Sequence, residues 1–124
     1  MKKIYYLKTC NTSVRILKQL KEAVSEEYYK SFTIQEIKTQ ALTVDQLEEI
    51  YALAGTYESL FSKRAKKYTQ MGLKNQALTE KDFRRLLLDE YTFLKRPVIR
   101  IDNTIFIGNT KKNVQDLLEK VKGK

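Results

Sequence analysis

The sequence predicts an α/β fold in which a β-α-β unit is followed by a helical segment and then by a β-β-α unit. Three observations support this prediction: helical periodicity that begins near residue 12, two β-branched runs separated by Asp102-Asn103, and an amphipathic stretch at the end of the chain. The 124 residues are enough to bury a core without disulfides and fit a single domain, residues 1–124.

The first part of the chain predicts strand, helix and strand. Residues 3–7 form a short apolar run that leads into the polar loop 8–11, which contains Cys10. From Thr12 onward, apolar residues recur at helical spacing; they are Val14, Leu17, Leu20 and Val24. Residues 31–37 then alternate between apolar and polar, as a half-buried strand should. The two strands are expected to be parallel, with a right-handed crossover.

The middle of the chain, about residues 42–95, predicts a helical insertion. Thr43 is a good N-cap for a helix that Gly55 would end. Thr79 would cap a later helix, and Asp82 follows it in a pattern that only loosely matches a capping box.

The last third predicts a hairpin and a helix. Residues 98–101 and 104–107 are β-branched runs joined by a two-residue turn, and residues 114–121 carry apolar side chains at helical spacing. A parallel β-α-β unit followed by β-β-α is the arrangement of the thioredoxin fold. The expected sheet is therefore four-stranded and mixed, with helices flanking it.

The composition limits the chemistry that the chain can carry. It has no histidine and one cysteine, which excludes a Cys-His pair, a Ser-His-Asp triad and a histidine-based zinc site, so no metal is expected. One cysteine cannot form an internal disulfide, and no apolar run approaches the ~20 residues of a membrane span. We therefore expect a cytoplasmic protein that does not enter a membrane.

Positive charge is concentrated in the middle of the chain. The net charge is +9, and the stretch 62–85 contains eight basic residues against two acidic ones. Such a surface suits nucleic acid, an acidic protein or an anionic substrate, but it is equally typical of a solvated face. Nothing in the sequence indicates a helix-turn-helix, so direct DNA binding is not expected.

Cys10 is the candidate reactive residue. It precedes the N-terminus of the first predicted helix, where the helix dipole lowers the pKa of a thiol, and Lys8 and Arg15 would add to that effect. The N–H groups of the same turn, at Asn11, Thr12 and Ser13, would bind an oxyanion. An isolated cysteine is also often a small buried hydrophobic residue, and the local sequence leaves both interpretations open.

The one proline, Pro97, follows Arg96 directly before the third predicted strand. Proline is tolerated at the first residue of a strand, and its peptide bond is the kind that can be cis.

Four segments in order resemble the arsenate reductase (ArsC)/Spx/YffB family. They are IYYLKTCNTSVRILKQL, LFSKRAKKYTQMGL, LTEKDFRRLLL and KRPVIRIDNTIFIGNTKKNVQDLL. The family includes glutaredoxin-coupled arsenate reductases and Spx transcriptional regulators. The resemblance implies a thioredoxin-like fold with a helical insert, a reactive Cys10 and a cis-proline at Pro97 that faces it.

The chain departs from both branches of the family. Spx-like members follow the nucleophile with a second cysteine in CxxC, where this chain has Ser13, so any redox cycle would be monothiol. Of the arginines expected in arsenate reductases, Arg96 matches, whereas Val14 and Gly108 stand at two other positions. These departures argue against arsenate as the substrate, because a trianionic oxyanion needs several charge-assisted hydrogen bonds.

Three functions follow from the resemblance. The first is a thiol-dependent oxidoreductase with glutathione or glutaredoxin as reductant and no bound cofactor. Its catalytic residues would be Cys10 and Arg96, and the anion would be bound by Asn11, Thr12, Ser13, Arg15, Arg64 and Pro97. The alternative is an Spx-like regulator that binds an RNA polymerase subunit, for which Arg64 matches the Spx-like relatives. The third is an inactive remnant of the fold. The expected partners are glutaredoxin, thioredoxin or RNA polymerase, and the protein is expected to be a monomer.

Overall fold

The computed structural model describes residues 1–124, and its contacts divide the chain into two units. The first unit consists of Met1–Gln40 and Arg96–Lys124, and the second is the intervening segment Ala41–Lys95. The predicted helical insertion, about residues 42–95, lies within this second unit.

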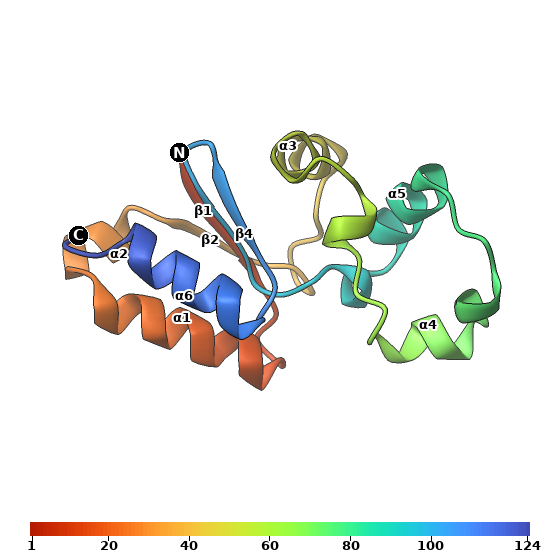
Figure 1. Cartoon of the computed structure of the whole chain (residues 1–124), viewed down its shortest axis with the longest axis horizontal. Helices are drawn as coiled ribbons and strands as arrows, with labels where there is room; N and C mark the ends of the chain where they lie inside the picture. Colours follow the sequence, from red (N-terminus) through yellow and green to blue (C-terminus); the bar gives the residue numbers. More distant parts are fainter. The chain divides into compact units, whose positions relative to one another are not determined.

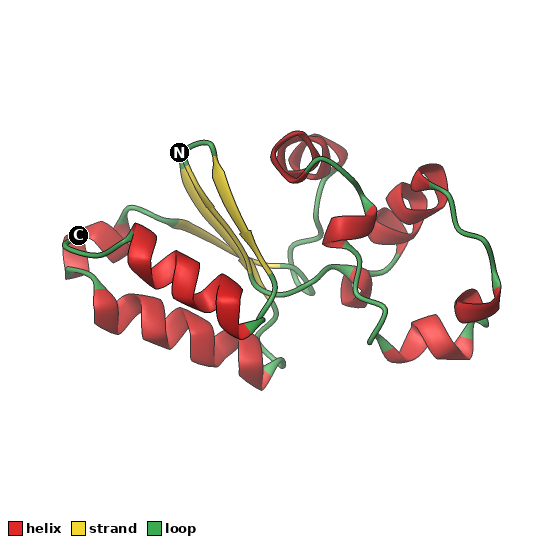
Figure 2. Ribbon diagram, in the orientation of Figure 1, coloured by secondary structure: helices red, strands yellow, loops and turns green.

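A four-stranded mixed sheet forms the first unit (Figure 2). Its strands are β1 (Lys2–Tyr6), β2 (Thr33–Glu36), β3 (Val98–Ile101) and β4 (Thr104–Ile107). In the order β2-β1-β3-β4, β1 runs parallel to β2 and antiparallel to β3, and β3 runs antiparallel to β4. This arrangement confirms the predicted α/β class with a thioredoxin-like β-α-β and β-β-α order.

Two helices cover one face of this sheet. The helices of the first unit are α1 (Asn11–Ala23), α2 (Glu26–Lys30) and α6 (Lys111–Lys120). Figure 1 shows α1 and α6 side by side along the sheet. The buried core that joins them to the strands consists of Ile4, Ile16, Leu17, Leu20, Phe32, Ile99, Ile101, Phe106, Leu117 and Val121. Burying these apolar side chains is the main source of stability of this unit.

The phase of α1 differs from the predicted one. Its buried residues are Ser13, Ile16, Leu17 and Leu20, which follow the i, i+3, i+4, i+7 pattern of one helix face. Val14 lies about 100° away from that face and is 43% exposed. The prediction that Val14 belongs to the apolar stripe is therefore wrong, because the buried place is taken by a serine.

The connection from α1 to β2 contains a short helix that the sequence analysis missed. Ser25 caps α2 by accepting a hydrogen bond from the Tyr28 N–H. Ser31 is the C-cap of α2, so the strand begins at Thr33 and not at Ser31 as predicted.

The hairpin matches its prediction. β3 and β4 have the predicted bounds, and Asp102 in the turn between them adopts φ 53°. Aspartate tolerates this left-handed conformation better than most residues, which is why the turn can be tight.

The second unit is helical. Its elements are α3 (Val44–Ala54), η1 (Glu58–Leu60), α4 (Lys66–Gln70), η2 (Leu73–Asn75), α5 (Glu80–Asp89) and η3 (Tyr91–Phe93). Phe61 lies at its centre, with its ring centroid 4.8 Å from that of Phe93 and 5.0 Å from that of Phe83. Thr43 and Gly55 bound α3 as predicted. Thr79 and Asp82 form a complete capping box, whereas the sequence predicted only a loose match to this motif.

None of the helices has both the length and the apolar character needed to cross a membrane.

Candidate active site

Cys10 lies at the turn between β1 and α1, where it is the N-cap residue of α1. The turn is closed by the Cys10 N–H, which donates to the Leu7 carbonyl at 3.0 Å. The Cys10 side chain is half-buried and makes no capping hydrogen bond, and the first turn of α1 has no acidic residue. The helix N-terminus beside the thiol thus keeps backbone N–H groups that no side chain has capped.

Ser13 holds this turn from within α1. Its side chain is fully buried, and its Oγ accepts a hydrogen bond from the Leu7 N–H at 3.4 Å. The hydroxyl that stands where CxxC proteins have a second cysteine therefore stabilises the chain that leads to Cys10.

Glu36 holds the turn from the neighbouring strand, and the sequence analysis missed it. The Lys8 N–H donates to Glu36 Oε2 at 3.0 Å, and the Thr39 N–H donates to Oε1 at 2.9 Å. Burial by itself would raise the pKa of Glu36, but the hydrogen bonds from Lys8 and Thr39 outweigh it and lower that pKa. Lys8 and Glu36 are 28 positions apart, so no local pattern could have indicated the contact.

Arg96 and Pro97 lie at the same end of the sheet as Cys10. The peptide bond between them is cis, as the family resemblance implied. Since Tyr5 pairs with Val98 in an antiparallel register, the chain leaves β1 where it enters β3. The Pro97 carbonyl accepts from the Gly108 N–H at 2.8 Å, which ties this corner to the end of β4.

The remaining predicted site residues belong to α1 and to the second unit. Asn11 and Thr12 occupy the first turn of α1, whereas Arg15 is exposed and lies five residues after Cys10, away from its face of the helix. Arg64 is an exposed residue of the second unit, between η1 and α4. The roles assigned to all of the site residues stay predictions.

A match to a family model decides the affiliation of the chain. The model of the ArsC family matches residues 5–117 and so covers nearly the whole sequence. The chain belongs to the ArsC family. Within this family it has the thioredoxin-like fold described above.

Solved structures of ArsC-family and other proteins share this fold. An arsenate reductase from Vibrio cholerae is 15% identical, with a TM-score of 0.72 and 95% of each chain covered. An ArsC-related protein from Brucella melitensis is 19% identical, with a TM-score of 0.67, and the match covers 93% of this chain and 92% of the other. A protein from Staphylococcus aureus is 25% identical, with a TM-score of 0.69 and coverage of 94% and 97%. No curated protein matches the chain.

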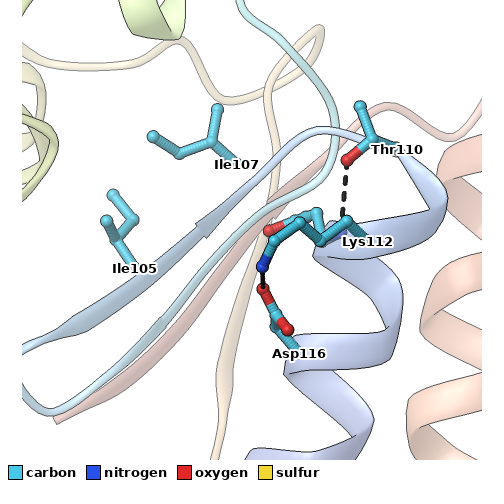
Figure 3. A pocket seen from close by; sticks show the side chains of 6 residues that line it. Ile105, Ile107, Thr110, Lys112 and Asp116 are labelled. Atoms are coloured by element: carbon cyan, nitrogen blue, oxygen red, sulfur yellow. Dashed lines mark hydrogen bonds and ion pairs between the residues drawn. The ribbon is translucent and has the colours of Figure 1, made fainter.

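One hollow of the chain lies between the edge strand β4 and the start of α6 (Figure 3). It has a volume of about 330 Å³, and its lining residues are Ile105, Ile107, Thr110, Lys112, Asn113 and Asp116. Lys112 and Asp116 are ion-paired at 2.8 Å within it. None of the predicted site residues lines this hollow.

No group of three or more histidine, cysteine, aspartate or glutamate side chains in the structure is placed to hold a metal ion.

Proposed function

We propose that the protein is a thiol-dependent oxidoreductase in which Cys10 acts as a single nucleophile, with glutathione or glutaredoxin as the reductant. The observation that supports this proposal is the place of Cys10 as N-cap of α1, a 13-residue helix whose first turn lacks a capping side chain. A negative charge is favoured there, because the helix dipole and the free N–H groups stabilise a thiolate relative to a thiol.

The proposed reaction is a monothiol exchange. The Cys10 thiolate attacks the glutathione sulfur of a mixed disulfide, so that a new S–S bond forms to Cys10 while the old one breaks and the substrate leaves as a thiolate. A second glutathione thiolate then attacks the sulfur of the bound glutathione. This step breaks the Cys10–glutathione S–S bond, forms glutathione disulfide and returns the Cys10 thiolate. The cycle thus converts one mixed disulfide and one glutathione thiolate into the substrate thiolate and glutathione disulfide.

The proposed substrate is a disulfide and not arsenate. Val14 and Gly108 supply no charge at two positions where arsenate reductases are expected to have arginine. Binding arsenate would require several charge-assisted hydrogen bonds, whereas thiol exchange needs a reactive thiolate and access to sulfur. In the proposed mechanism Arg96 attracts the anionic glutathione moiety to the site.

The deciding experiment is a titration of the Cys10 thiolate by ultraviolet absorbance, with Cys10→Ser as the blank. We expect an apparent pKa well below the ~8.5 of a free cysteine. We also expect the protein to turn over a glutathione mixed disulfide and Cys10→Ser to lose this activity. A thiol with an ordinary pKa and no turnover would refute the proposal.

A second candidate function is that of an Spx-like regulator that binds an RNA polymerase subunit. Of the eight basic residues in the stretch 62–85, four have no ion pair: Arg64, Lys66, Lys74 and Lys81. Unpaired cations on an exposed surface favour an acidic partner. Under this alternative, a salt-sensitive complex with the polymerase would form equally well with Cys10→Ser, and charge reversal at Arg64 and Lys66 would weaken it.

A further inference from the structure

We propose that Glu36 is a positioning residue for Cys10, which holds the β1–α1 turn in the geometry that places the thiol at the N-terminus of α1. This inference rests on the proposed function of Cys10. Nothing in the sequence or in the family resemblance indicated a role for Glu36.

The contacts of the turn place Glu36 in this role. Two successive N–H groups at the start of the turn have side-chain acceptors: Leu7 donates to Ser13 Oγ at 3.4 Å, and Lys8 donates to Glu36 Oε2 at 3.0 Å. Ser13 belongs to α1, which the turn itself leads into, whereas Glu36 belongs to β2. The Glu36 contact therefore anchors the turn to the sheet independently of the helix.

The Glu36 carboxylate is itself held rigidly. Its Oε1 accepts from the Thr39 N–H at 2.9 Å and from the Thr39 Oγ1 at 3.0 Å. The Glu36 carbonyl accepts from the Gln40 N–H at 2.9 Å, which closes the turn after β2. With Oε1 fixed in this way, Oε2 is presented to Lys8 in one orientation. A preorganised acceptor loses little entropy when it binds the turn.

The position of the turn matters because the influence of a helix N-terminus is short-ranged. It falls off within the first turn of the helix, so the thiolate is stabilised only while Cys10 stays at the N-cap. Releasing Lys8 would loosen the segment Leu7–Cys10 and withdraw part of this stabilisation. Cys10 would then react more slowly as a nucleophile near neutral pH.

A direct electrostatic role of Glu36 predicts the opposite sign. A carboxylate near a thiol disfavours the thiolate, so removing its charge would speed the alkylation of Cys10. The sign of the change therefore separates positioning from a charge effect.

The test measures the alkylation rate of Cys10 by iodoacetamide against pH in the wild type, Glu36→Ala and Glu36→Gln. We expect Glu36→Ala to slow the alkylation of Cys10 near neutral pH about threefold, because iodoacetamide reacts with the thiolate. Glu36→Gln should fall between the two, since its amide oxygen keeps one of the two acceptors. Glu22→Ala, on the exposed face of α1, is the matched control and should behave as the wild type. An unchanged or faster alkylation of Cys10 in Glu36→Ala would overturn the proposal.

Amide hydrogen exchange keeps this test separate from that of the proposed function. If the wild-type Cys10 pKa is ordinary, the oxidoreductase proposal fails, and positioning is then judged from the Lys8 and Cys10 amides. Glu36→Ala should still unfold cooperatively on heating. Faster hydrogen exchange of both amides than in the wild type then supports the proposal that Glu36 fixes the turn. Unchanged exchange at Cys10 shows that Glu36 does not position it.

Discussion

Ser13 and Cys10 lie three residues apart in the β1–α1 turn but in different environments. Ser13 is fully buried and its hydroxyl accepts from the Leu7 N–H, whereas Cys10 is half-buried and its thiol makes no capping contact. Ser13 therefore contributes a hydrogen bond to the structure of the turn, whereas the Cys10 thiol remains partly accessible for reaction. At the residue scale, the two positions of the Cys-x-x-Ser segment thus have separate tasks.

We predict that Ser13→Ala destabilises the protein by about 1–3 kcal/mol, because the buried Leu7 N–H loses its acceptor. The free energy of unfolding in urea measures this loss. Thr12→Ala is the matched control: Thr12 is the adjacent residue of the same helical turn and is only half-buried, so its replacement should change the stability by less than about 0.5 kcal/mol. Equal effects of the two substitutions would show that the Leu7 contact contributes nothing.

At the scale of elements, helix caps define the second unit. The Asp82 N–H donates to Thr79 Oγ1 at 3.4 Å, and the Thr79 N–H donates to Asp82 Oδ2 at 2.8 Å, which completes the capping box of α5. The hydrogen bonds from Thr79 lower the pKa of Asp82. The start of α5 is therefore satisfied by the N-cap residue Thr79 together with Asp82 in the first turn of the helix.

Thr79→Ala should cost about 1 kcal/mol of unfolding free energy, because the Asp82 N–H at the start of α5 loses Thr79 Oγ1 as its acceptor. Thr69→Ala, at an exposed position within α4, should be neutral or slightly stabilising, since alanine is the better helix former. Chemical denaturation of both variants makes the comparison. A neutral Thr79→Ala would mean that water replaces the cap without loss.

Gly55 ends α3 with φ 90°, and a Cβ added there would have no atom within 4 Å. Gly55→Ala therefore tests the backbone conformation alone, without a steric clash. We expect a loss of roughly 1–2 kcal/mol in unfolding free energy, and a smaller loss for Gly55→Asn, which tolerates this region better. If alanine were tolerated as well as asparagine, the end of α3 would have to adopt another conformation.

The elements that the sequence predicted well are those with strong local signals. The hairpin has its predicted bounds because β-branched residues flank a two-residue turn, and Thr43 with Gly55 marked both ends of α3. The short helix α2 was missed because its five residues make less than two turns and none of its side chains is fully buried. Val14 was misplaced because a polar residue, Ser13, occupies the buried position that periodicity assigns to apolar ones.

The candidate site could also be predicted only where a local signal or the family resemblance indicated it. Local sequence placed Cys10 before a helix, and the family resemblance supplied the cis-proline. The contacts that hold the site could not be predicted, since Glu36 reaches Lys8 across two strands and Gly108 reaches Pro97 across the β3–β4 pair. Such contacts depend on register and side-chain direction, which are decided by the packed sheet.

At the scale of the whole molecule, charge balance controls the response to acid. The 15 acidic residues offset part of the charge of 24 basic ones at neutral pH. Hydrogen bonds and ion pairs keep the pKa values of Glu36, Glu48, Asp82, Glu90 and Asp102 below their ordinary values. Acidification removes these contacts and at the same time increases the net positive charge, and both effects favour the unfolded chain.

Glu90 offers the sharpest test of this acid response. Its side chain is 16% exposed and ion-paired with Lys67. The hydrogen bond from Lys67 is the main reason that the pKa of Glu90 lies below the usual 4.5, and the N–H and hydroxyl of Thr92 lower it further against the opposing effect of burial. Because the pKa is lower in the folded state, this carboxylate stabilises the fold above about pH 4.5, and that stability is lost as the pH falls through the folded-state pKa.

Glu90→Gln should therefore reduce the free energy of unfolding at neutral pH and flatten its decline below about pH 4.5. The two curves should converge at the lowest pH, where Glu90 is protonated and as neutral as the glutamine. Urea denaturation at a series of pH values gives both curves, with Glu119→Gln at an exposed position of α6 as control. A Glu90→Gln curve that runs parallel to the wild type down to the lowest pH would show that protonation of Glu90 is not linked to unfolding. The acid sensitivity would then have to come from the other carboxylates and from the repulsion among the 24 basic residues.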